Sequence, residues 1–159
     1  MRLATLATCL LAALPAAADP VKMAGSYRTC TPEASEQGRG VVAGTCGMLA
    51  VPDFTGVAFQ SAEDLANGAA MRDAFLQQVE TYGQCVSELI TSRLQHEDVA
   101  DGFDADAAAC AHAWAEDQAT QVVRGYGQAC LAYADRSIVD IRLTAYDGPC
   151  YPVTETPLP

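Results

Sequence analysis

The sequence predicts an α+β fold dominated by helices, in which an antiparallel helical hairpin carries a small disulfide-tied β element. Two long amphipathic helical patterns lie between residues 61 and 135. A turn-rich segment precedes them, and a stretch in which apolar and polar residues alternate follows them. Helical and strand periodicities in one short chain indicate a single mixed domain, which we expect to span residues 19–150.

Residues 1–18 have the features of a secretory signal peptide. Met1-Arg2 gives a short positive start, an apolar run extends to Pro15, and three alanines precede Asp19. Such a run is too short to span a membrane, and small residues favour cleavage. We expect cleavage near Ala18 and a periplasmic or secreted mature protein, and the sequence does not choose between these two compartments.

Six cysteines follow the leader. They are Cys30, Cys46, Cys85, Cys110, Cys130 and Cys150. An even number of cysteines in an exported chain predicts structural disulfides. The sequence contains no Cys-x-x-Cys pair, which argues against a redox or zinc motif. Fifteen connectivities are possible. Hairpin geometry favours Cys85 with Cys110 near the tip, leaving the other four to tie the flanking segments to the open end.

Residues 19–60 form a turn-rich arm. Three prolines and several glycines interrupt it, which disfavours a long helix. The apolar runs 41–43 and 48–51 flank Gly44-Thr45-Cys46-Gly47, a pattern that allows a small β-hairpin.

Residues 61–135 are expected to form the helical hairpin. An apolar stripe at helical spacing marks the first helix: Phe75, Val79, Tyr82, Val86 and Leu89. Asn67-Gly68 predicts a break before this helix. The second helix is rich in alanine, with Asp104 as its cap. A connector of about nine residues makes the two helices antiparallel.

Residues 136–150 are predicted to form a strand. Val139, Ile141, Leu143 and Ala145 alternate with polar residues, as on a half-buried strand. Residues 151–159 are expected to be a flexible, proline-rich tail.

The chain is strongly acidic, with a formal net charge of −11 at pH 7. This charge repels nucleic acid and anionic membranes, which makes both poor partners. It is compatible with a basic protein partner, with divalent cations, or with solubility alone.

Two clusters could carry chemistry. The connector from Glu97 to Asp106 is acidic, but an EF-hand register with Gly102 in sixth place puts Ala108 where the bidentate carboxylate belongs. A solvated loop with a helix cap is therefore favoured over a cation site.

His112 and Glu116 lie four residues apart on one helical face, and with Asp117 they could form a small hydrolase site. A simple i,i+4 pair is the favoured interpretation.

Aromatic residues offer one further candidate. Trp114 with Tyr82, Tyr126 and Tyr133 could line a pocket between the helices and the arm, although core packing is the more common use of such a set.

The sequence assigns no catalytic, cofactor or metal role to any residue. The leading hypothesis is a non-enzymatic exported protein that binds or modulates another exported protein. A small hydrolase at His112 and Glu116 and an acidic-loop cation binder are the alternatives. The sequence leaves open the partner, the oligomeric state and the disulfide pairing.

Overall fold

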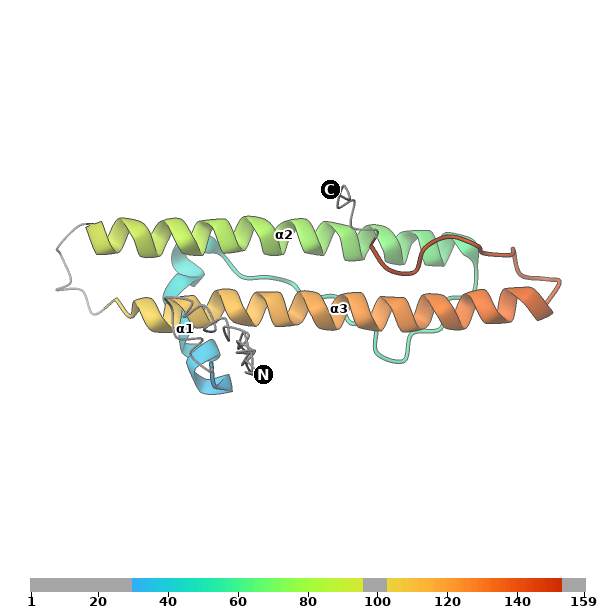
Figure 1. The fold of residues 1–159 in the computed structure, drawn as a ribbon, viewed down its shortest axis with the longest axis horizontal. Helices are drawn as coiled ribbons and strands as arrows, with labels where there is room; N and C mark the ends of the chain where they lie inside the picture. Colours follow the sequence, from blue (N-terminus) through green and yellow to red (C-terminus); the bar gives the residue numbers. More distant parts are fainter. Residues whose placement is uncertain (1–29, 96–102, 153–159) are drawn as a thin grey trace, which may run out of the picture.

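The computed structural model describes residues 30–95 and 103–152. Within them lie three helices: α1 (Pro32–Cys46), α2 (Ala62–Gln95) and α3 (Ala105–Val139). Helices α2 and α3 lie side by side and antiparallel, and α1 crosses them near the connector end (Figure 1). Neither described range contains a strand. The prediction of an α+β fold with a β element is therefore wrong, whereas the antiparallel helical hairpin is present.

Helix α2 begins with a reciprocal cap. The Ser61 hydroxyl accepts a hydrogen bond from the Asp64 backbone N–H at 3.0 Å, and the Asp64 carboxylate accepts one from the Gln60 N–H at 3.1 Å. The helix continues through Gly68, where the sequence predicted a break. A Cβ at Gly68 would lie 2.7 Å from the Phe59 ring, so this glycine provides room for an aromatic side chain instead of a turn.

Helix α3 begins as the sequence predicts, with the Asp104 carboxylate accepting the Ala107 N–H at 2.9 Å. Its alanines pack against α2 and α1, and Ala108, Ala111 and Ala115 are fully buried. Small side chains allow this close approach between helices. The helix ends at Val139, beyond the predicted end at residue 135.

Helix α1 replaces the expected β-hairpin of the arm. The Thr31 hydroxyl caps it by accepting the Ala34 N–H at 3.2 Å, and Pro32 occupies its first turn. The sequence predicts that glycines disfavour a helix here, but a Cβ at Gly38 would collide with the Ala107 carbonyl of α3. The absent side chain thus permits helix contact. The helix ends at Cys46, and the capping residue Gly47 has a φ of +75°, which favours glycine.

The predicted strand at 136–150 is also absent. Its first residues belong to α3, and the rest form an irregular segment, residues 140–152, which we name the carboxy-terminal strap. No described strand lies beside it, so side chains satisfy its backbone instead. The Tyr133 hydroxyl donates to the Thr144 carbonyl at 3.0 Å, and the Tyr146 N–H donates to the Ser137 hydroxyl at 3.2 Å. Ile141, expected on the buried face, is fully exposed.

The two ends of the hairpin have different cores. Near the connector, glycine and alanine bring the helices together. At the far end, Phe54 and Phe59 pack on Tyr126, with ring centroids 5.6 and 5.8 Å from the tyrosine ring. Both phenylalanines belong to residues 47–61, the extended segment between α1 and α2 that we name the amino-terminal strap. Aromatic side chains of the strap fill space that α1 does not reach.

A buried arginine joins the far end to the carboxy-terminal strap. The Arg72 side chain is 8% exposed, and its guanidinium carbon lies 4.4 Å from the centre of the Tyr126 ring. It donates to the Asp73 carboxylate at 2.8 Å and to the Cys150 carbonyl at 3.5 Å. These contacts compensate the cost of burying a charge and hold the strap against α2.

Candidate functional site

The six cysteines form three disulfides in the described part of the chain. Cys30–Cys110, Cys46–Cys85 and Cys130–Cys150 have Cα–Cα distances of 5.4, 5.7 and 5.5 Å. The first two fix the two ends of α1 to different helices of the hairpin. The third holds the carboxy-terminal strap on α3. Disulfides thus attach both α1 and the carboxy-terminal strap to the hairpin.

The expected Cys85–Cys110 pairing is wrong. Gly83 lies opposite His112, so Cys85 and Cys110 stand at a similar level along the two antiparallel helices. The neighbouring Val86 and Ala111 are buried, and the Ala111 backbone lies beside Gly38 of α1. Both cysteines instead face α1, which crosses the hairpin and bonds to one helix at each end.

His112 and Glu116 lie together, as the sequence predicts. Nε2 of His112 is 3.7 Å from a carboxylate oxygen of Glu116, and the two side chains are 38% and 67% exposed. The imidazole lies over Gly83 of α2, where a Cβ would be 2.5 Å from Nε2. The pair is a partly exposed i,i+4 contact on the surface of the hairpin.

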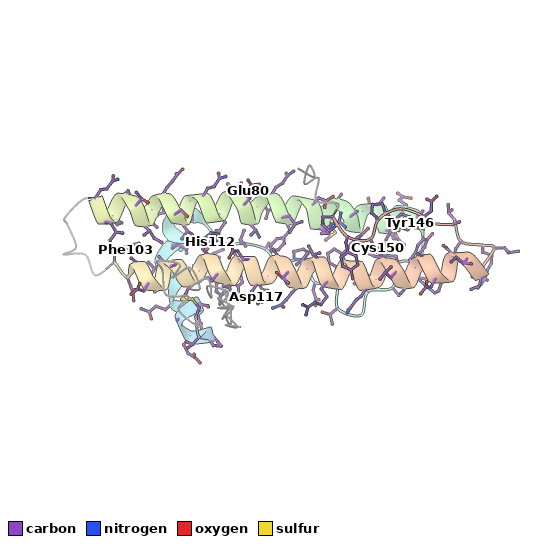
Figure 2. All side chains as sticks on the ribbon, in the orientation of Figure 1. Glu80, Phe103, His112, Asp117, Tyr146 and Cys150 are labelled. Atoms are coloured by element: carbon purple, nitrogen blue, oxygen red, sulfur yellow. A yellow bond between two sulfur atoms is a disulfide. The ribbon has the colours of Figure 1, made fainter. Side chains whose placement is uncertain are left out.

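Asp117 does not join this pair. Figure 2 places His112 between α2 and α3 and Asp117 on the edge of α3 that faces away from α2. The Asp117 carboxylate accepts a hydrogen bond from the Gln121 amide at 2.6 Å. The described residues contain no group of three or more His, Cys, Asp or Glu side chains that could hold a metal ion.

Asp117 instead borders a hollow of about 500 Å³ between α1 and α3. The Arg39 guanidinium carbon lies 4.5 Å from the centre of the Trp114 ring in this hollow. Trp114 therefore lines a cleft, as one of the two interpretations held, while Tyr82, Tyr126 and Tyr133 pack in the core. Burial raises the pKa of Tyr82, and the nearby Arg39 charge partly opposes this rise.

The acidic connector is described only in part. Asp104 caps α3 and Asp106 lies in its first turn, as the cap interpretation predicts. Residues 96–102, which include Glu97, lie outside the described residues. Cation binding by the connector stays a prediction.

One face of the hairpin carries an open groove between α2 and α3. It consists of two adjoining hollows of about 560 and 450 Å³ that share Leu76. We name this surface the α2/α3 groove. Its floor is formed by apolar or small residues and the His112 ring: Leu76, Val79, Gly83, His112, Ala119 and Val123.

The α2/α3 groove lies on the opposite side of α3 from α1. On the α1 side, Gly38 packs on Ala107, and Phe54 of the amino-terminal strap packs on Gly125. On the groove side, the carboxy-terminal strap covers α3 at Gly127, beneath the Tyr151 ring. Tyr151, itself 45% exposed, closes that end of the groove. The strap therefore covers the far half of this face and leaves the connector half open.

The rim of the α2/α3 groove is acidic. Glu80 and Glu88 of α2 and Glu116 of α3 border the hollow nearest the connector, and all three are exposed. Arg124 borders the hollow nearest Tyr151. The groove thus combines an apolar floor with a rim that is negative over most of its length.

No protein-family model, curated protein or solved structure matches this chain. Any function must therefore be argued from the residues themselves.

A second apolar surface lies at the far tip of α3. Ile138, Val139 and Ile141 are 79%, 81% and 100% exposed. Among the described residues we find no helix that could span a membrane.

Sequence reasoning missed the α2/α3 groove. It considered a pocket at Trp114 but not the Arg39 side chain that lies over this ring. The groove residues of α3 do recur at helical spacing, with His112, Glu116, Ala119 and Val123 on one face. This pattern indicates a shared face. It does not tell whether another part of the chain covers that face.

Proposed function

We propose that this chain is an exported, non-catalytic protein-binding module that uses the α2/α3 groove as its binding surface. The observation that carries the proposal is an apolar concave surface left open between two helices, each of which a disulfide ties to one end of α1. Exposed apolar surface rimmed by polar residues is typical of protein interaction sites.

The disulfides support two parts of this proposal. Bonds of this kind persist in oxidising compartments, which agrees with a chain exported to the periplasm or beyond after cleavage near Ala18. They also limit the motion of the elements that flank the groove. A preorganised surface loses less conformational entropy on binding and therefore binds more tightly.

Comparative affinity capture from the exported fraction tests the proposal. Wild-type protein is compared with Val123→Glu, which places a charge in the groove floor, and with Ile138→Glu, the matched change at the exposed tip. We expect wild-type protein and Ile138→Glu to retain the same partner and Val123→Glu to lose it by tenfold or more, since burying an unpaired carboxylate is costly.

Two outcomes of this experiment would contradict the proposal. Retention of the partner by Val123→Glu together with loss by Ile138→Glu would move the binding surface to the tip. Absence of any specific partner of the wild-type protein would overturn the protein-binding function itself.

A further inference from the structure

We infer that the occupant of the α2/α3 groove is an amphipathic helix of another protein with Lys and Arg flanking its apolar stripe. This inference rests on the proposed function and adds the chemistry of the partner. The shape, length and charge of the groove each support it.

The shape of the groove favours a helix. Its walls are two packed helices, and the natural way to cover the apolar seam of such a pair is a third helix whose side chains fit between theirs. An extended peptide usually adds to an open strand edge, and the described ranges offer no strand. The small floor residue Ala119, which is only partly buried, lets a helix approach closely.

The length of the groove defines the segment that it can hold. On α3 it extends from His112 to Arg124, and the twelve helical rises between these residues span about 18 Å. A partner helix of about three turns matches this length. Such a helix presents three or four apolar side chains at i, i+3/i+4 and i+7 to the floor.

The charge of the rim defines the flanks of that helix. Glu80, Glu88 and Glu116 stand along the groove, with Arg124 at one end. Lys and Arg beside the apolar stripe of the partner would face these carboxylates, which raises the association rate and excludes acidic competitors. A second copy of this chain is disfavoured because its own acidic rim would face an identical one, and the chain carries a net charge of −11.

Site-specific photo-crosslinking identifies the occupant directly. A photoreactive benzoylphenylalanine replaces Thr120, an exposed residue that borders the α2/α3 groove, in the full exported chain. The control replaces Ala132, an exposed α3 residue that lines no part of the groove. After irradiation in the exported fraction, the cross-linked peptide is sequenced. We expect position 120, and not position 132, to attach to a partner segment with helical apolar spacing and flanking Lys or Arg.

A charge-reversal pair tests the rim. Glu80→Lys with Glu116→Lys should weaken binding of the captured partner about tenfold at low salt, with a smaller loss at high salt where charges are screened. Asp135→Lys with Asp147→Lys changes the net charge equally at exposed positions outside the groove and should leave affinity unchanged.

The outcomes separate this inference from the proposed function. If a partner is captured but position 120 cross-links to an acidic segment, to a second copy or to residues 153–159 of the same chain, the inferred partner class is wrong while protein binding stands. Equal weakening by both charge-reversal pairs would also contradict it. If no partner is captured at all, the proposed function fails first.

Discussion

The two faces of the α2/α3 hairpin use similar residues for different purposes. On the covered face, Gly38 and Gly125 are contact points where a Cβ would meet α3 or the amino-terminal strap. On the open face, Gly83 makes room for the His112 ring, and Ala119 and Val123 line the α2/α3 groove. Small side chains therefore mark both a packed seam and an open floor. What distinguishes the two faces is whether another segment of the chain is attached across them.

The largest expected effect is on the attachment of α1 to the covered face. Replacing Cys30 and Cys110 by alanine opens a link across 80 residues, and loop-closure entropy predicts a loss of about 4 kcal/mol in the free energy of unfolding. Replacing Cys130 and Cys150, which are 20 residues apart, should cost about 3 kcal/mol. Urea unfolding of both variants measures the two losses. A smaller loss for the Cys30–Cys110 variant would contradict the role given to this link.

Two glycines of α1 test whether this helix packs closely against α3. Gly38→Ala places a methyl group against the Ala107 carbonyl, and we expect a loss of about 3 kcal/mol as α1 is displaced. A Cβ at Gly40 meets nothing within 4 Å, so Gly40→Ala should stabilise the helix by about 0.5–1 kcal/mol. Thermal unfolding distinguishes the two. Equal effects of the two substitutions would mean that α1 does not contact α3 at Gly38.

Two neighbouring valines of α3 allow a core position to be compared with a position on the floor of the α2/α3 groove. Val122 is 4% exposed, and Val122→Glu should cost about 3 kcal/mol or more because burying a carboxylate without a paired charge is costly. Val123 lines the α2/α3 groove, so Val123→Glu should change the free energy of unfolding by no more than about 0.5 kcal/mol. Chemical denaturation checks both values. A loss above 2 kcal/mol for Val123→Glu would show that the groove is part of the core.

Alkaline pH should produce a smaller loss of stability. Burial raises the pKa of Tyr82 above its ordinary value of 10.0, with Arg39 opposing this, and burial together with the nearby Tyr146 and Asp73 raises that of Tyr126. The Arg72 charge partly opposes the rise at Tyr126. Between the unfolded and folded pKa values the folded state holds more protons, so stability is fully present below pH 10 and falls as the pH rises above it. Tyr82→Phe should reduce this slope in pH-dependent unfolding experiments. An unchanged slope in that variant would exclude Tyr82 as a contributor.

The sequence could predict the hairpin because its signals are local. The stripe from Phe75 to Val86 and the Asp104 cap depend on spacing within one helix, and both are present in the structure. The structure also contains the disulfides expected from the even number of cysteines.

The errors arose where tertiary contacts decide the conformation. Gly38 resembles a helix breaker until Ala107 is seen beside it, and the alternation at Val139 and Ile141 resembles a strand although no described strand lies beside it. The pairing of Cys85 depended on α1, which the sequence did not reveal. The α2/α3 groove was missed for the same reason. Its extent depends on the path of the carboxy-terminal strap, which covers this face of α3 only as far as Tyr151.

Carbene footprinting of side chains, with and without the captured partner, tests the central claim most directly. If the α2/α3 groove is the binding surface, labelling of Leu76, Val123 and Tyr151 falls when the partner is bound. Labelling of Met48, which is 86% exposed outside the groove, and of Ile138 at the tip stays the same. Unchanged labelling in the groove with a fall at Ile138, Val139 and Ile141 would contradict the account and assign binding to the tip of α3.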